Sequence, residues 1–60
     1  MTKTIGNYTV KLDGNSNLIT IYNKSEMIYG KAFGAYDSGS AFTNICTQVQ
    51  TKVNKENAKS

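Results

Sequence analysis

The chain has 60 residues and a net charge of +3, with seven basic residues, all of them lysine, against four acidic ones. This length allows a single domain, which we expect to span residues 1–60, and the lone cysteine excludes an internal disulfide. The lack of histidine and of a second thiol excludes a soft-metal cage, and the lack of arginine weakens any case for sequence-specific DNA reading.

Residues 4–12 predict the first strand. Tyr8, Val10 and Leu12 alternate with polar residues, which is the period of a half-buried strand. Residues 13–17 follow and begin with Asp-Gly, the strongest turn pair in this stretch. The pattern therefore predicts a strand that ends in a turn.

Residues 18–23 predict the second strand, because they are rich in β-branched and aromatic side chains. We assign Ile19 and Ile21 to its core face, since two isoleucines make the more apolar side. The polar residues 23–26 then predict a second turn.

Residues 27–36 predict a third strand with two unlike faces. One face is small and carries Ile28, Gly30, Ala32, Gly34 and Tyr36. The other is larger and carries Met27, Tyr29, Lys31, Phe33 and Ala35. Glycine inside a strand marks a bulge, a bend or the close approach of another backbone. We expect the helix to cross close above the small face, with a ligand or partner strand at that place as the alternative.

The last predicted element is an amphipathic helix from residue 41 onward, with Ser38 or Ser40 capping its first turn. Its apolar residues recur at the spacing of one helical stripe, and they are Phe42, Ile45, Cys46, Val49 and Val53. A cysteine on such a stripe is expected to be a small buried side chain and not a reactive thiol. The predicted fold is α+β: a three-stranded antiparallel β-meander followed by one C-terminal α-helix packed on one sheet face.

Groups suited to catalysis are scarce. Without histidine the commonest general base is missing. The four carboxylates are Asp13, Glu26, Asp37 and Glu56, and no two of them have the spacing of one strand face or one helix face. We predict that the chain is not an enzyme and that it uses no metal and no cofactor.

The sheet face turned away from the helix is the predicted functional surface. We place on it Lys11, Leu18, Tyr22, Tyr29, Lys31 and Phe33. Aromatic residues with few charges are typical of interface cores, so we interpret this patch as a partner or dimer interface. Aromatics interleaved with lysines would also suit base stacking and phosphate neutralisation, which keeps a small DNA- or RNA-binding module as the alternative.

A domain this short has marginal stability, and self-association is one of the usual supplements, so we expect a homodimer. The expected function is a non-catalytic protein–protein interaction module. Its size and its frequent Asn, Lys, Ile and Tyr suit a phage or mobile-element accessory protein that inhibits or regulates a host or defence protein. A structural subunit of an assembly is a further alternative. With no signal-peptide pattern and no long apolar span, we expect a cytoplasmic location and no membrane partner.

Three short strands, an aromatic residue at the strand–helix junction and an amphipathic helix together resemble the small YegP-like β-β-β-α domains. The resembling stretch runs from Tyr8 to Val49. It includes Ile28 with Ala32, the junction of residues 34–38, and Ile45 with Val49 on the helix. The resemblance implies this topology and a tendency to self-pair, and it implies no activity.

Overall fold

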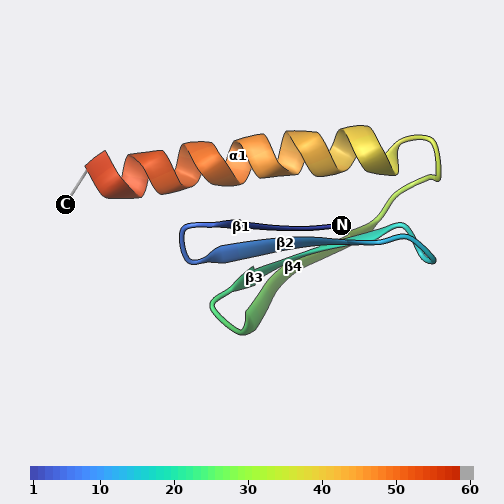
Figure 1. The fold of residues 1–60 in the computed structure, drawn as a ribbon, viewed down its shortest axis with the longest axis horizontal. Coiled ribbons are helices and arrows are strands. Elements are labelled where there is room, and N and C mark those ends of the chain that lie inside the picture. The colour runs from blue at the N-terminus through green and yellow to red at the C-terminus, as the bar shows by residue number, and fades with distance from the viewer. Residues whose placement is uncertain (59–60) are drawn as a thin grey trace.

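The computed structural model describes residues 1–58, so residues 59–60 of the predicted domain lie outside the described residues. The elements are β1 (Thr2–Ile5), β2 (Tyr8–Asp13), β3 (Leu18–Asn23), β4 (Glu26–Ala32) and α1 (Ser38–Ala58). The strands form one antiparallel sheet in the order β1-β2-β3-β4, and α1 runs along one face of it (Figure 1). The α+β class and the C-terminal helix are confirmed, whereas the prediction of three strands is wrong because the sheet has four.

The additional strand arises from a tight turn inside the predicted first strand. Gly6 and Asn7 form the loop between Ile5 and Tyr8, which are Cα partners in the β1–β2 hairpin. Gly6 has a φ of +58°, which glycine adopts without a steric penalty, and glycine is favoured at the first loop position of a type II′ turn. The hairpin brings Ile5 and Tyr8 to the same face, which a single strand would not have done.

The other two turns lie where the sequence predicts them. In the β2–β3 turn the amide of Asn15 donates to the Asp13 carboxylate (2.9 Å), and the amide of Asn17 donates to the Asp13 carbonyl (2.8 Å). Asn17 and Lys24 take the left-handed conformation, with φ of 55° and 61°. Asparagine tolerates that conformation well, whereas lysine at the β3–β4 turn is under mild strain.

The core lies between α1 and the sheet face toward it. Val10 and Ile19 have no exposed surface, which confirms the assignment of Ile19 to the core face. Within residues 1–58, the buried core consists of Ile5, Tyr8, Val10, Ile19, Phe42, Ile45, Cys46, Val49 and Val53. Every apolar residue of the predicted helical stripe is among them, so the amphipathic helix is confirmed. Cys46 is a buried side chain, also as predicted.

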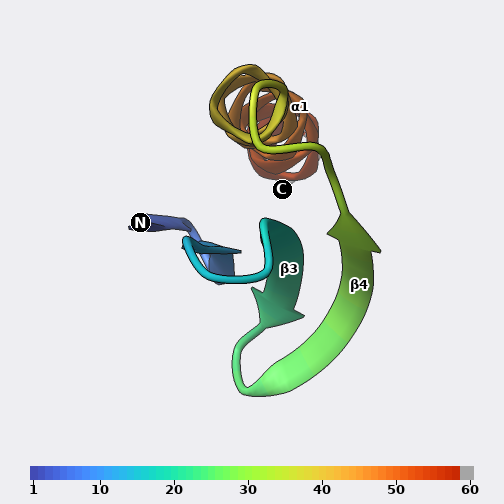
Figure 2. The ribbon, with the colours of Figure 1, turned by 90° about the vertical axis from the view of Figure 1, so that its right-hand side faces the viewer.

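α1 covers only part of the sheet. It packs against β1, β2 and β3, whereas no Cα atom of β4 comes within 8 Å of α1 in the described part of the chain. Figure 2 shows the β3–β4 hairpin curving away from the helix. The expected close crossing above Gly30, Ala32 and Gly34 is therefore wrong. A Cβ on Gly30 would meet Thr20 Cγ2 at 3.6 Å, on the sheet face away from α1.

The predicted third strand also ends earlier than expected, because a turn precedes the helix. The amides of Asp37 and Ser38 both donate to the Gly34 carbonyl, at 3.0 and 2.9 Å. This turn leaves the Tyr36 side chain 100% exposed instead of continuing the strand through it. The Ser38 hydroxyl donates to the Ala35 carbonyl (3.4 Å), so it closes the turn and does not act as the predicted acceptor for first-turn amides.

Candidate functional site

The six residues predicted to form one interface are divided between the two faces of the sheet. Lys11, Leu18 and Tyr22 lie on the face away from α1, as predicted, since they alternate along β2 and β3 with the buried Val10 and Ile19. The Lys11 ammonium lies 5.0 Å from the centre of the Tyr22 ring. This half of the predicted patch is therefore brought together, and we call its sheet face the outer face.

Tyr29, Lys31 and Phe33 belong to the opposite side. Tyr29 is the Cα partner of Ile21 and Lys31 that of Ile19, so their side chains point to the α1 side of the sheet. Phe33, just after β4, packs against the buried core. Their predicted place on the outer face is wrong. The prediction assigned the face with the smaller side chains to the helix side. Side-chain size does not determine the register in which a strand pairs, and the register decides which face of the sheet each side chain occupies.

The first candidate site is the free edge of the sheet at β4, which we call the β4 edge (residues 26–32). All seven residues of this strand are exposed. Three of them are large and apolar: Met27 is 59% exposed, Ile28 48% and Tyr29 40%. An edge strand presents a row of unpaired N–H and C=O groups, and a long apolar one is a template for another strand.

A bulge in the β3–β4 pairing decides which side chains of β4 share a face. The register shifts between Ile21 and Tyr22, which leaves Ile28 without a Cα partner in β3. Residues five apart in a regular strand point to opposite faces. The additional residue instead brings Glu26 and Lys31 to the same face, the one toward α1. The β4 edge therefore carries an acidic group near its start and a basic group near its end.

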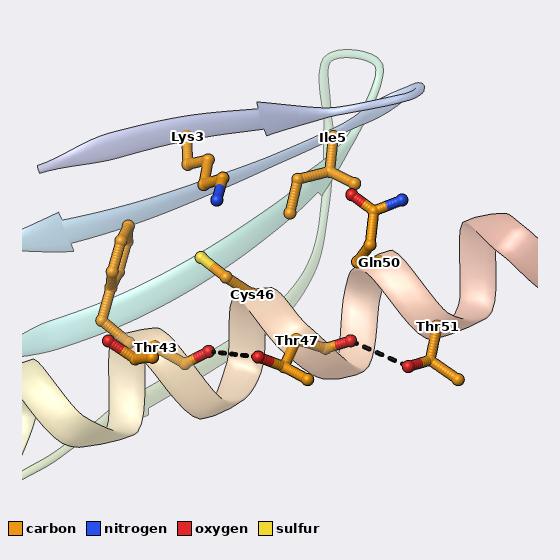
Figure 3. A pocket seen from close by; sticks show the side chains of 8 residues that line it. Lys3, Ile5, Thr43, Cys46, Thr47, Gln50 and Thr51 are labelled. Carbon is orange, nitrogen blue, oxygen red and sulfur yellow. Dashed lines mark hydrogen bonds between the residues drawn. The ribbon is translucent and has the colours of Figure 1, made fainter.

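The second candidate site is a groove between β1 and α1 at the other edge of the sheet, which we call the β1–α1 groove. Its volume is about 320 Å³, and it is lined by Lys3, Ile5, Phe42, Thr43, Cys46, Thr47, Gln50 and Thr51. Figure 3 shows Lys3 and Ile5 reaching from β1 toward the helix. The lining contains one cationic side chain and no carboxylate among these residues. Sequence reasoning missed this groove because it merged β1 and β2 into one strand.

A row of threonines forms the helical wall of the β1–α1 groove. The hydroxyls of Thr43, Thr47 and Thr51 donate to the carbonyls of Gly39, Thr43 and Thr47, at 3.2, 3.1 and 3.0 Å. Each hydroxyl proton is used in a hydrogen bond to a helix carbonyl. The threonine side chains can therefore only accept hydrogen bonds from a molecule in the groove, through their oxygen lone pairs, or contact it through their methyl groups. Cys46 lies in this lining with only 6% of its surface exposed. The groove therefore combines apolar surface with a single cation at its rim.

Two of the acidic side chains have hydrogen-bond partners within the fold. The Tyr8 hydroxyl donates to Glu56 Oε1 (3.1 Å), which joins the start of β2 to the end of α1. The Asn15 amide and the Ser16 hydroxyl hydrogen-bond to the Asp13 carboxylate and hold its pKa below the usual 3.8. Within residues 1–58, no three His, Cys, Asp or Glu side chains lie together as a metal ion would need. No helix in that range is long and apolar enough to cross a membrane.

Comparison of the chain with protein-family models, with curated proteins and with solved structures found no match. The resemblance to YegP-like domains thus stays a prediction, as does the expected function.

Proposed function

We propose that this chain is a non-catalytic protein–protein interaction module that works as a homodimer joined through the β4 edge. The observation that carries the proposal is an edge strand of seven exposed residues, with large apolar side chains, that α1 leaves uncovered. Soluble proteins usually protect such an edge with charges, bulges, proline or a covering element. β4 has a bulge at Ile28 and charged residues at Glu26 and Lys31, but the large apolar side chains between them remain exposed. Pairing with a second copy would protect it here and would extend the sheet across both copies.

Charge favours a second copy as the occupant. In an antiparallel pair related by a two-fold axis, each end of β4 lies against the other end of its symmetry mate. In the register that we propose, Glu26 of one copy is opposite Lys31 of the other, and the pair occurs twice. Both side chains lie on the face toward α1, which is the condition for a direct cross-strand pair. The bulge at Ile28 is what satisfies that condition.

The same register gives a role to Gly30, the glycine inside β4. Met27 lies opposite Gly30 of the second copy, and both are on the outer face. A Cβ on Gly30 would make an ordinary van der Waals contact with Thr20 Cγ2 at 3.6 Å, so the outer face has room for side-chain atoms at this glycine. The Met27 side chain would cover it, in the way that long side chains compensate for glycine on edge strands. The exposed apolar area of two Met27 side chains would be removed from water together.

Composition supports the non-catalytic part of the proposal. The chain has no histidine and only four carboxylates, one of which is engaged by Tyr8 and another by the β2–β3 turn. A small protein of this kind acts by occupying a surface of another protein at a fixed ratio. Regulation or inhibition of a host or defence protein by a phage or mobile-element factor is the setting that its size and its frequent Asn, Lys, Ile and Tyr suit.

The outer face favours protein over nucleic acid. A nucleic-acid platform needs several cations along the backbone path as well as aromatic rings. On the outer face of β2, the cation of Lys11 is followed at the same side by the carboxylate of Asp13, so the two charges offset each other. Tyr29, Lys31 and Phe33 do not add to that face.

A structural subunit of an open assembly is the other alternative. An open assembly and a closed dimer differ in their mass distribution.

Sedimentation velocity from micromolar to millimolar concentration tests the proposal. Wild type is expected as a dimer, and Ile28→Lys as a monomer with an unchanged far-UV circular dichroism spectrum, because it places a charge in the centre of the β4 edge. Tyr36→Lys is the matched control at a fully exposed position outside β4. A monomeric wild type at all concentrations, or a dimeric Ile28→Lys, would overturn the proposal. A broad series of larger species would favour the open assembly.

A further inference from the structure

The hydrogen bonds of β1 show which of its backbone groups are free. The Met1 amine donates to the Leu12 carbonyl (2.9 Å), and the Leu12 amide donates to the Met1 carbonyl (2.8 Å). Mutually bonded positions alternate along an antiparallel pair, so Lys3 also bonds to β2. Thr2 and Thr4 therefore direct their N–H and C=O groups away from β2, toward the open edge of the sheet.

A strand added at this edge would place alternate side chains in the β1–α1 groove. Lys3 and Ile5 point toward α1, and residues opposite them on an added strand point to the same side (Figure 3). The position opposite Lys3 suits an acidic side chain, because Lys3 is the one charged residue of the lining. The position opposite Ile5 suits an apolar side chain, because Ile5 would be its cross-strand neighbour and Phe42 and Cys46 also line the groove.

We propose that the β1–α1 groove binds an extended peptide segment of another protein, antiparallel to β1, by strand addition. The segment exchanges backbone hydrogen bonds with Thr2 and Thr4. It carries an apolar side chain opposite Ile5 and, two residues later, an acidic side chain opposite Lys3. Backbone pairing supplies affinity in this mode of recognition, and pockets for alternate side chains supply specificity. The groove volume of about 320 Å³ lies at the lower end of the range of ligand sites and suits these side chains.

Charge argues against a second copy of this chain as the occupant. An antiparallel pair that uses Thr2 and Thr4 of both copies would place Lys3 directly opposite its own symmetry mate. Like charges directly opposite each other destabilise a strand pair. The acidic foreign segment has the opposite preference. This site lies at the other sheet edge from β4 and does not depend on the proposed homodimer.

Fluorescence anisotropy at low ionic strength with a capped, labelled peptide tests the inference. The probe is Ser-Thr-Val-Thr-Glu-Thr-Ser, with its valine opposite Ile5 and its glutamate opposite Lys3. We expect saturable binding to wild type and at least about fivefold weaker binding of the same peptide with lysine in place of glutamate. Lys3→Glu is expected to reverse this preference, whereas Lys24→Glu, with the same change of net charge outside the groove lining, keeps it.

Methylation of single peptide nitrogens separates strand addition from mere charge attraction. The nitrogen of the threonine between valine and glutamate faces Thr4, and its methylation should abolish binding. The nitrogen of the glutamate faces solvent, and its methylation should leave binding within about twofold of the parent peptide. Absence of binding by the parent peptide would overturn the inference. So would binding that Lys3→Glu leaves unchanged, or an equal response to both methylations.

Discussion

The turn residue Gly6 lies against Val53 of α1, so closely that a Cβ on Gly6 would stand 3.1 Å from Val53 Cγ1. The turn between β1 and β2 therefore packs directly against the helix at Gly6. We predict that Gly6→Ala lowers the free energy of unfolding by about 1–3 kcal/mol, because it adds both a left-handed alanine and a steric contact. Urea denaturation followed by circular dichroism measures this change.

Gly14 in the β2–β3 turn is the matched control for Gly6. A Cβ there would meet no atom within 4 Å, and Gly14 does not have a positive φ. Gly14→Ala should change the free energy of unfolding by less than about 0.5 kcal/mol. Equal effects of the two substitutions would contradict the proposed packing of the Gly6 turn on the helix.

The hydrogen bond from Tyr8 to Glu56 connects residues 48 apart in the sequence. Tyr8→Phe keeps the buried ring and removes the hydroxyl, so we predict a loss of about 0.5–1.5 kcal/mol of stability. Glu56→Gln keeps an acceptor and should cost less than Tyr8→Phe. In a double-mutant cycle with Glu56→Ala, the two losses should not add, because each variant removes the same bond. Additive losses would show that this bond contributes nothing to stability.

The placement of Phe33 on the core side of the sheet predicts a graded response to aspartate. Phe33→Asp should lower the thermal midpoint more than Tyr36→Asp, whose site is fully exposed, because it brings an unpaired charge against the core. Phe33→Asp should lower the thermal midpoint less than Ile45→Asp does, because Ile45 lies within the buried helical stripe. If Phe33→Asp is as mild as Tyr36→Asp, the assignment of faces in this segment is wrong.

The lowered pKa of Asp13 predicts a stability loss in acid. A carboxyl whose folded-state pKa lies below its unfolded value stabilises the fold above that unfolded value, here 3.8, and this contribution disappears as the pH falls through the folded-state pKa. Asp13→Asn keeps an acceptor for the Asn15 amide but does not titrate. Denaturation midpoints of wild type should therefore fall more steeply below about pH 4 than those of Asp13→Asn. Parallel curves would contradict this role.

Periodicity predicted the parts of the fold that depend on local pattern. The helical stripe and the β2–β3 and β3–β4 turns could be predicted because each is set by spacing or by a few turn residues, such as Asp13, whose carboxylate accepts from the Asn15 amide. The β1–β2 turn left two signals that reasoning from the alternating pattern overlooked. In a single continuous strand Ile5 would point to the face opposite that of Tyr8 and Val10, although all three are apolar. The Gly-Asn pair between Ile5 and Tyr8 is typical of a two-residue hairpin loop.

The candidate sites depend on information that no local pattern contains. The bulge at Ile28 reverses which residues of β4 share a face, and it is visible only from the pairing with β3. The β1–α1 groove likewise joins residues more than 35 positions apart, as Ile5 and Cys46 show. A sequence can indicate that Lys31 and Phe33 are on one face of a strand, which is correct. It does not say which face of the sheet that is.

Charge exchange between Glu26 and Lys31 tests the central claim most directly. Glu26→Lys and Lys31→Glu each place like charges opposite each other twice in the proposed dimer, and each should raise its dissociation constant by about tenfold or more. The double variant restores opposite charges in reversed order, so sedimentation equilibrium should return a dissociation constant close to that of wild type. If neither single variant weakens the dimer, or if the double variant is weaker than both, the β4 edge does not join the two copies in this register.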